Sequence, residues 1–297
     1  MTPAPRDYFL LVALALCWGT NYFVTKVAVA EIAPATLTLG RLGAASAVLL
    51  LVHKAKRLDW PHEGRVWAQM AVLALTANAI PYLLIAWAQL HVDSGLAAIL
   101  IAAAPLFTLA SAQMLTSDEK LTAWRAGGVA LGFVGIVVLV GVDALAGLGR
   151  NLWAQLALLG AAFCYGLNAV LARRLPPTPT VTTSLCVSFI AGAMMFPVAV
   201  AVDGLEAAAP SWPAILAVLW LGAVSTALAL LIYFTIIAAA GATFAILANY
   251  LVPLLALGLG GLFLGESPTW NALLALALIL AGVYLTGRGR AAAAGSN

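Results

Sequence analysis

The sequence predicts an all-α integral membrane protein of ten transmembrane helices, arranged as two inverted five-helix repeats around a central cavity. The first supporting observation is composition: 64% of the 297 residues are hydrophobic and 8% are charged, whereas soluble domains carry about 25% charged residues. The second is a series of apolar segments, each near the roughly 20 residues that a helix needs to cross a bilayer. The third is an internal repeat, because the pattern from Cys17 to Asn21 recurs from Cys164 to Asn168, 147 positions later.

Apolar segments bounded by polar or turn-forming residues give the expected spans, at 8–29, 34–53, 66–90, 94–115, 122–141, 151–172, 180–202, 212–239, 242–264 and 269–287. Their Gly and Ala content and their apolar character on most faces are typical of helices packed in lipid. With five spans in each copy, an odd number, the second copy must enter the bilayer upside down. We therefore expect a single transmembrane domain over residues 1–297, with repeat one at 1–145 and repeat two at 146–297.

The distribution of Lys and Arg orients these spans, because positive charge accumulates in the cytoplasmic connections of membrane proteins. With a cytoplasmic amino terminus, the outer connections hold only Arg150. The sequence therefore predicts ten spans with both termini on the cytoplasmic side of the membrane. The inner segments then hold eleven of the fourteen cations: Arg6, Lys54, Lys56, Arg57, Arg65, Lys120, Arg125, Arg173, Arg174, Arg288 and Arg290.

Span three offers a candidate lining for the cavity. At about 100° per residue, Asn78, Tyr82 and Gln89 fall on one helical face and would present amide and hydroxyl groups at several depths. Their alternative role is to hydrogen-bond to neighbouring helices. Pro81 lies among them and removes a backbone donor, so a local kink is expected.

Span one and its repeat supply a second set of candidates. Trp18 lies at mid-span, where a ring can stack on an apolar or aromatic solute, whereas aromatic anchors normally lie near headgroups. Asn21 and its repeat partner Asn168 would either form the floor of a binding site or hydrogen-bond between helices, and the sequence leaves both open.

Two cations fall inside predicted spans, where a charge is costly and is by default a functional candidate. Arg41 would either attract an anionic group, such as a substrate carboxylate, or bond to helix ends. Lys26 is expected to extend towards the surface or to pair with Glu31.

The second repeat adds Asn249 and Tyr250 in span nine, which we include among the substrate-binding candidates. Span eight carries Ser225, Thr226 and Tyr233, which would either join this polar cluster or serve packing, and packing is favoured because Ser and Thr often bond to carbonyls of their own helix. No Asp or Glu falls well inside a span, so we expect transport without an obligatory titrating carboxylate in the membrane.

Several of these segments together resemble the drug/metabolite transporter superfamily, in its group with two tandem five-helix units. In the first repeat they are Trp18-Gly19-Thr20-Asn21-Tyr22, Arg41 and Pro105-Leu106-Phe107, and in the second Pro253-Leu254-Leu255 and Leu264-Gly265-Glu266. The resemblance covers essentially the whole chain. The first repeat departs from the pattern, since it has Thr116-Ser117-Asp118-Glu119 where the family usually shows Leu-Gly-Glu.

The resemblance implies export of metabolites, amino acids or drugs from a bacterial cytoplasm, and in length and style the chain is similar to aromatic amino-acid exporters. Within that fold, the Asn, Gln and Tyr set with Arg41 favours an amino-acid solute over the multidrug or other metabolite alternative. An intramembrane enzyme would need a paired-carboxylate, Ser-His or zinc arrangement, and a channel would need rings of charge, so both are disfavoured.

The expected partners are a small-molecule substrate and the lipid bilayer. No cofactor, metal or nucleic acid is expected, because the three cysteines lie in apolar segments and the basic residues are scattered over short connections. The sequence leaves the oligomeric state open, and a monomer is consistent with it.

Overall fold

The fold is described from a computed structural model of the whole chain. It describes residues 3–92, 94–115, 123–140, 151–204 and 210–241, together with 244–245, 247–248, 251–252, 270, 274, 277–278, 281–282 and 284–285. Helices make up the ordered elements of this described part, which contains no strand. Asn249 and Tyr250, two of the expected site residues, lie outside it.

The helical elements of the first repeat often begin where proline fixes the first turn, as at Pro5 and Pro34. They are α1 (Pro5–Gly19), α2 (Asn21–Val29), α3 (Pro34–Ala55), α4 (Gly64–Ala74), the π-helix η1 (Leu75–Ala79), α5 (Ile80–Ala88), α6 (Ser94–Ile101), α7 (Ala104–Leu115) and α8 (Ala123–Val140). The second repeat contributes α9 (Leu152–Ala172), α10 (Thr180–Val198), the π-helix η3 (Ala199–Asp203), α11 (Trp212–Gly222), the π-helix η4 (Ala223–Leu228) and α12 (Ala229–Ala240).

Seven helices of the described residues are long and apolar enough to cross a membrane. They confirm seven predicted spans to within a few residues: Pro5–Val29, Pro34–Ala55, Gly64–Ala88, Leu96–Leu115, Leu152–Ala172, Thr180–Asp203 and Trp212–Ala240. The fifth predicted span coincides with α8, whose apolar part is the shorter Ala126–Gly135. The ninth and tenth predicted spans fall mostly outside the described residues, so the total of ten stays a prediction.

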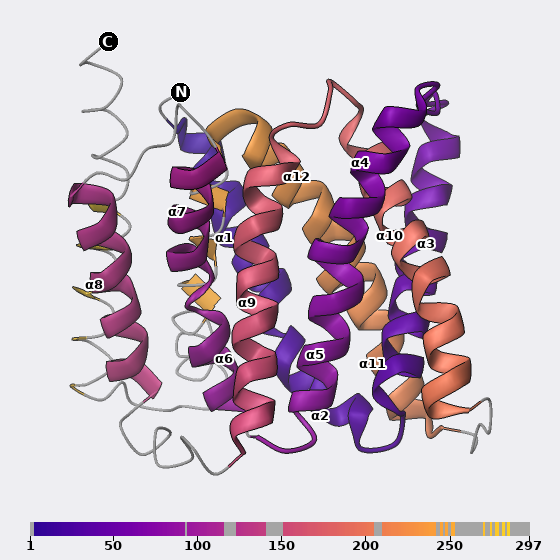
Figure 1. Ribbon diagram of the computed structural model, residues 1–297, viewed down its shortest axis with the longest axis horizontal. Coiled ribbons are helices and arrows are strands. Elements are labelled where there is room, and N and C mark those ends of the chain that lie inside the picture. The colour runs from indigo at the N-terminus through magenta and orange to yellow at the C-terminus, as the bar shows by residue number, and fades with distance from the viewer. Residues whose placement is uncertain are drawn as a thin grey trace.

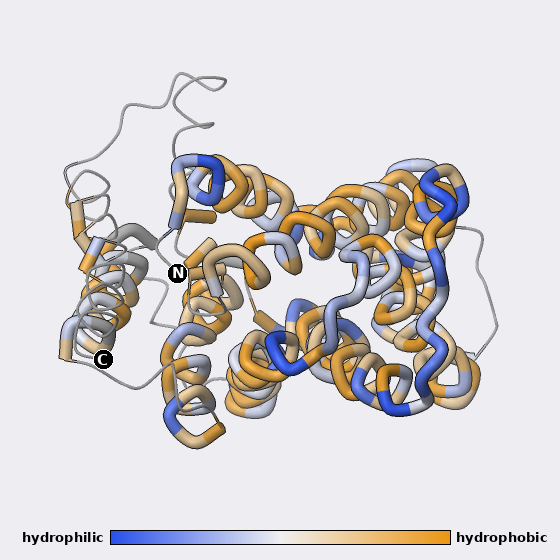
Figure 2. Tube along the Cα trace, turned by 90° about the horizontal axis from the view of Figure 1, so that it is seen from above, coloured by the Kyte–Doolittle hydropathy of each residue, from blue (hydrophilic) through white to orange (hydrophobic). Residues whose placement is uncertain are grey.

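The helices stand side by side as one bundle, with α8 at one edge and α3 and α10 at the other (Figure 1). The amino terminus lies at the same end of the bundle as the connection from α3 to α4 and that from α9 to α10 (Figure 1). Hydrophobic residues follow the helices, and hydrophilic residues concentrate in connections and helix ends (Figure 2). This distribution is the one that a bilayer around the bundle requires.

The two repeats interlock through α3 and α10, which pack against each other. At one end, Asp203 accepts hydrogen bonds from the backbone N–H and the hydroxyl of Thr36, at 2.6 and 2.9 Å. At the other end, the hydroxyl of Thr182 lies 3.5 Å from the carbonyl oxygen of Asp59. The start of each helix therefore meets the end of the other, so these two helices of equivalent position run in opposite directions.

A π-helical segment interrupts the same span in each repeat. It covers Leu75–Ala79 in repeat one and Ala223–Leu228 in repeat two, so their starts are 148 positions apart, close to the spacing of the cysteine motif. The packing is reciprocal as well, since α10 contacts η1 and α3 contacts η4. Such segments are frequently found at functional sites, and both adjoin the pocket described below.

Glycine allows one of these contacts to be close. A Cβ atom at Gly222, where α11 meets η4, would lie 2.5 Å from the Cβ of Ala44 and 2.7 Å from the carbonyl oxygen of Arg41. The absence of a side chain at Gly222 therefore lets η4 approach α3 closely enough to reach Arg41.

Candidate functional site

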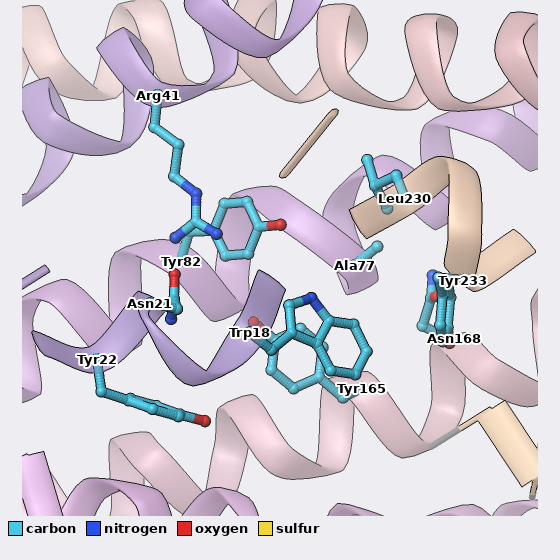
Figure 3. Close-up of a pocket in the computed structure, with 10 residues that line it drawn as sticks. All are labelled: Trp18, Asn21, Tyr22, Arg41, Ala77, Tyr82, Tyr165, Asn168, Leu230 and Tyr233. Carbon is cyan, nitrogen blue, oxygen red and sulfur yellow. The ribbon is translucent and has the colours of Figure 1, made fainter. Parts of the chain in front are cut away.

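A pocket lies inside the bundle, between helices of both repeats, and we call it the central pocket (Figure 3). Its cavity volume is about 40 Å³, which is space for only a few water molecules. Aromatic rings and amides form most of its wall, with one guanidinium. The described lining residues are Trp18, Asn21, Tyr22, Arg41, Ala77, Tyr82, Tyr165, Asn168, Leu230 and Tyr233.

The pocket brings together five of the residues that the sequence singled out. They come from four different predicted spans and converge on one volume (Figure 3). All but Trp18 are buried. The five are Trp18, Asn21, Arg41, Tyr82 and Asn168.

Asn78 and Gln89 are fully buried but are not among these lining residues. Gln89 donates from Nε2 to the carbonyl oxygen of Tyr22 at 3.1 Å, so it takes the alternative role of bonding between helices. The expectation that Asn78 shares a face with Tyr82 assumed an α-helix throughout span three. Because η1 inserts a wider turn there, it shifts the angular register between Asn78 and Tyr82.

Arg41 is the cation of the pocket and only 5% exposed. Its Nε donates to the hydroxyl of Thr226 at 2.7 Å, and one terminal nitrogen lies 3.5 Å from the carbonyl oxygen of Ser225. The guanidinium carbon lies 3.6 Å from the ring centroid of Tyr82, a cation–π contact. The structure is therefore compatible with both roles considered for Arg41, because Arg41 bonds to η4 and its side chain also lines the pocket, where it could attract an anionic group.

The hydroxyl of Thr226 connects Arg41 to the helix backbone through two hydrogen bonds. Its hydroxyl accepts from Arg41 and donates to the carbonyl oxygen of Leu221 at 2.8 Å. Leu221 lies five residues earlier, the spacing of a π-helical turn. Thr226 thus bonds to a carbonyl of its own helix, as expected, and in addition orients Arg41.

Asn168 is held by the other π-segment in the same manner. Its Nδ2 donates to the hydroxyl of Thr76 at 2.9 Å and lies 3.3 Å from the carbonyl oxygen of Leu73, while the Thr76 hydroxyl donates to Val72 at 2.8 Å. On its other side, Asn168 Oδ1 accepts a long hydrogen bond of 3.4 Å from the hydroxyl of Tyr233. Each π-segment thus supplies a threonine that orients one polar side chain of the pocket.

Lys26 and Glu31 do not pair with each other. Lys26 donates to the carbonyl oxygens of Gln89 at 2.6 Å and Val92 at 3.2 Å, where α5 ends. Glu31 instead accepts from the backbone N–H and the hydroxyl of Ser211, at 2.8 and 2.7 Å, at the start of α11. These hydrogen bonds lower the pKa of the Glu31 carboxyl group below its ordinary value.

The sequence analysis missed five lining residues: Tyr22, Ala77, Tyr165, Leu230 and Tyr233. Tyr165 could have been found, because the 147-residue spacing pairs it with Trp18 as it pairs Asn168 with Asn21. For Tyr233, packing was expected, and its buried ring does pack against the ring of Trp18 at a centroid distance of 5.8 Å; in addition, Tyr233 lines the central pocket.

The central pocket combines one permanent positive charge with aromatic walls and amide groups, and its described lining contains no carboxylate. An anionic group would be attracted strongly here, because a low dielectric strengthens the field of Arg41. No group of three or more His, Cys, Asp or Glu side chains within the described ranges could hold a metal ion. The arrangement is therefore suited to binding an organic anion or zwitterion with an apolar part.

Comparison with solved structures shows the same fold in a crystal structure that matches with a TM-score of 0.73, covers 95% of this chain and 97% of the other, and is 20% identical. Curated relatives match over nearly the full length. The "Uncharacterized inner membrane transporter YedA" of Escherichia coli K12 is 28% identical over 94% of this chain and 90% of its own. The "Probable terminal-alkyne amino-acid exporter" of Streptantibioticus cattleyicolor is 27% identical over 95% of this chain and 94% of its own.

A further relative, "Protein PagO" of Salmonella typhimurium, is 24% identical over 93% of this chain and 91% of its own. The EamA-like transporter family model matches the chain twice, at residues 6–141 and 152–288. These matches agree with the internal repeat and with a general role in transport. The chain belongs to the EamA-like transporter family, within the drug/metabolite transporter superfamily, and contains two tandem copies of its domain.

Proposed function

We propose that this protein exports small amphipathic metabolites, most favourably amino acids with an apolar or aromatic side chain, across the bacterial cytoplasmic membrane. The observation that carries the proposal is Arg41, a buried cation in an aromatic pocket that has no carboxylate in its described lining. A guanidinium matches a carboxylate in shape and can bind it with two parallel hydrogen bonds. The solute carboxylate would therefore bind Arg41.

The remaining groups fit the other parts of an amino acid. Asn21 contributes a buried Oδ1 that has no hydrogen-bond partner among the described residues, so it can accept a hydrogen bond from the solute ammonium group. The faces of Trp18, Tyr22 and Tyr165 can bind the same cation or stack against an apolar side chain. The name of the Streptantibioticus relative, an amino-acid exporter, agrees with this choice.

The transport mechanism that we propose is alternating access by rocking of two inverted five-helix repeats within one domain. Three observations support it: the antiparallel α3 and α10, the reciprocal packing of the π-segments, and a pocket lined from both repeats. Its volume of about 40 Å³ cannot hold an amino acid, so helices must separate for a solute to enter. Ten spans and two cytoplasmic termini complete the proposed topology.

The energy source that we propose is the solute gradient itself, through facilitated diffusion or exchange. The polar groups of the described pocket lining are amides, phenols, an indole and a guanidinium, and Arg41 stays protonated at any physiological pH. Counterflow in proteoliposomes should therefore persist without a pH gradient. Solute movement that stops when the pH gradient is dissipated would refute this coupling.

The proposal is tested by counterflow of labelled phenylalanine, leucine, glutamate and a cationic dye in proteoliposomes. Wild-type protein should move the apolar amino acids, and Arg41→Gln should abolish that movement while retaining the detergent-solubilised fold. Arg41→Lys is the matched control, and because it keeps the charge without the planar fork, it should retain partial transport. Movement of the dye alone, or full amino-acid transport by Arg41→Gln, would favour the multidrug alternative.

A further inference from the structure

A basic surface lies at the end of the bundle that carries the amino terminus, where α3 passes into its connection to α4 (Figure 1). Lys54, Lys56 and Arg57 are exposed there within four positions, and the exposed Asp59 follows them. Residues 54–60 thus carry three positive charges and one negative charge. We call Lys54, Lys56 and Arg57 the α3 basic cluster.

Arg57 has an unusual backbone conformation. Its φ is 50°, and no other non-glycine residue in the described part of the chain has a positive φ. The N–H of Arg57 donates to the carbonyl oxygen of Lys54 at 3.1 Å. The N–H of Leu58 donates to the carbonyl oxygen of His53 at 3.3 Å. This pair of hydrogen bonds is the Schellman arrangement that ends many helices, in which the left-handed position is ordinarily glycine.

Arginine at this position carries a strain that glycine would avoid. In the left-handed conformation a Cβ atom approaches the following carbonyl oxygen. The turn does not require the side chain, because both of its hydrogen bonds join backbone groups. The helix dipole does not require it either, since Lys54 and Lys56 already place cations at the end of α3. Backbone strain of this kind is concentrated at functional positions, which points to a role for the exposed guanidinium of Arg57.

Aromatic rings hold the connection against the helix ends. The Trp60 ring lies 4.4 Å from the ring of His53 and 6.5 Å from that of Trp67, centroid to centroid. Trp67 Nε1 donates to the carbonyl oxygen of Pro61 at 3.0 Å. Trp60 nevertheless remains 45% exposed, as is typical of an indole at the level of the lipid headgroups. The basic cluster is therefore presented by a fixed turn that an interfacial tryptophan follows.

Apolar surface lies next to these cations on the exposed side of α3. Val48 and Leu51 are 37% and 70% exposed, and Lys54 follows Leu51 by three positions, on the same helical face. At 1.5 Å per residue, Leu51 and Lys54 are only about 4.5 Å apart along the helix axis. An acyl chain would contact Val48 and Leu51, and the headgroup of the same molecule would lie at Lys54. Apolar surface followed by cationic surface matches the order of groups in a phospholipid.

An anionic headgroup fits this surface better than a zwitterionic one. Several Lys and Arg residues beside a spanning helix attract an anionic leaflet and are typical of sites for anionic lipids. The guanidinium of Arg57 can bind a phosphate through two N–H groups, and the two lysines add charge without fixed geometry. A zwitterionic lipid carries an ammonium group near its phosphate, which the same three cations repel.

We propose that the α3 basic cluster is a binding site for an anionic phospholipid, in which Arg57 binds the phosphate, Lys54 and Lys56 attract the headgroup, and Leu51 contacts an acyl chain. The site lies on the helix that also carries Arg41. The assignment is independent of the transported solute. Binding can be measured on detergent-solubilised protein, where the orientation in the membrane has no influence.

Lipid binding is tested by native mass spectrometry of the full chain in a nonionic detergent, with dioleoyl phosphatidylglycerol and dioleoyl phosphatidylcholine as probes at equal concentration. Wild-type protein should bind phosphatidylglycerol preferentially. Arg57→Gly should lower the apparent affinity for phosphatidylglycerol about fivefold, the contribution of one cation near an anionic surface, and leave that for phosphatidylcholine unchanged. Combining Arg57→Gly with Lys54→Gln and Lys56→Gln should abolish the preference.

Thermal unfolding separates this role from a structural one. Because glycine relieves the strained φ, Arg57→Gly should unfold in lipid-free detergent at the same temperature as the wild type or a higher one. Its stabilisation by added phosphatidylglycerol should nevertheless be smaller, since a ligand stabilises in proportion to its binding. Arg57→Lys keeps the charge and the backbone conformation, and should retain most of the affinity.

Arg174→Gln is the matched control, because it removes one exposed cation from another connection at the same end of the bundle. Arg174 bonds to the carbonyl oxygen of Leu115, at the end of α7, and not to any part of α3. This variant should keep the wild-type preference for phosphatidylglycerol. An unchanged preference in Arg57→Gly, an equal loss in Arg174→Gln, or a lower unfolding temperature of lipid-free Arg57→Gly would overturn the assignment, whatever solute the protein transports.

Discussion

The anchoring of Arg41 by Thr226 gives the sharpest prediction for the central pocket. Thr226→Val keeps the shape of the side chain but removes the hydroxyl that accepts from Arg41 Nε at 2.7 Å and donates to Leu221 at 2.8 Å. Thr226 is fully buried and Arg41 is 5% exposed, so little water can replace the lost bond. We expect Arg41 to lose its fixed orientation as well as part of its hydrogen bonding.

The magnitude follows from the kind of bond. A hydrogen bond to a charged group contributes about 1.5–3 kcal/mol, and leaving a buried charged donor unpaired costs at least as much. The 3.5 Å contact to Ser225 is too long to compensate. The variant should therefore unfold about 1.5–3 kcal/mol more easily, and the KM for an anionic solute should rise about tenfold for each 1.4 kcal/mol lost from binding.

The assay compares thermal unfolding and counterflow kinetics for Thr226→Val, Thr226→Ser and Thr235→Val. Serine retains the hydroxyl and should restore the KM, which a purely structural role of the methyl group would not predict. Thr235 lies on α12, donates to the carbonyl oxygen of Leu231 at 2.6 Å and is not among the described lining residues of the central pocket, so loss of its hydroxyl should leave the KM unchanged. Equal KM values for the valine and serine variants at position 226 would refute the reasoning.

Further predictions concern packing and helix ends. Gly166→Ala would place a Cβ 2.7 Å from side-chain and backbone atoms of α7 and should destabilise the protein by about 1–3 kcal/mol in thermal unfolding, whereas Gly43→Ala, with no atom within 4 Å, should be neutral or stabilising. Because the pKa of Glu31 is lowered in the folded state, its contribution is present above the pKa of an unfolded glutamate and is lost as the pH falls through the lowered value. Glu31→Gln should accordingly weaken the pH dependence of Tm in the acidic range, and an identical profile would contradict the bond to Ser211. Lys26→Met should lower Tm because two carbonyl oxygens at the end of α5, at 2.6 and 3.2 Å, lose their donor, while Lys26→Arg should be milder.

Much of the fold was accessible from the sequence, because length and hydropathy decide whether a segment can cross a bilayer. Seven predicted spans agree with helices of the described residues to within a few positions. Hydropathy does not reveal where a helix widens into a π-turn. Tyr82 therefore lines the central pocket, whereas Asn78, which was expected on the same helical face, lies in η1 and is not among the described lining residues.

Some residues of the candidate site could be predicted from the sequence for a related reason. Arg41 and Asn168 are polar groups in an apolar environment, and such groups stand out because burying them is costly. Thr226 and Tyr233 do not stand out, since a threonine can satisfy its own helix and a tyrosine can serve as packing. Their roles depend on partners more than 60 residues away, at separations of 185 and 65 positions.

The sequence by itself determined that this chain crosses a membrane repeatedly, that its second half repeats its first, and that a few polar side chains lie among apolar ones. Each of these properties depends on local composition or on fixed spacing along the chain. Only the tertiary structure decided which side chains meet: Arg41 with Thr226, Asn168 with Thr76 and Tyr233. The reason is that helix packing and the register set by η1 and η4 turn each side chain towards the pocket or away from it. The hydropathy of a single span predicts neither the packing nor the register.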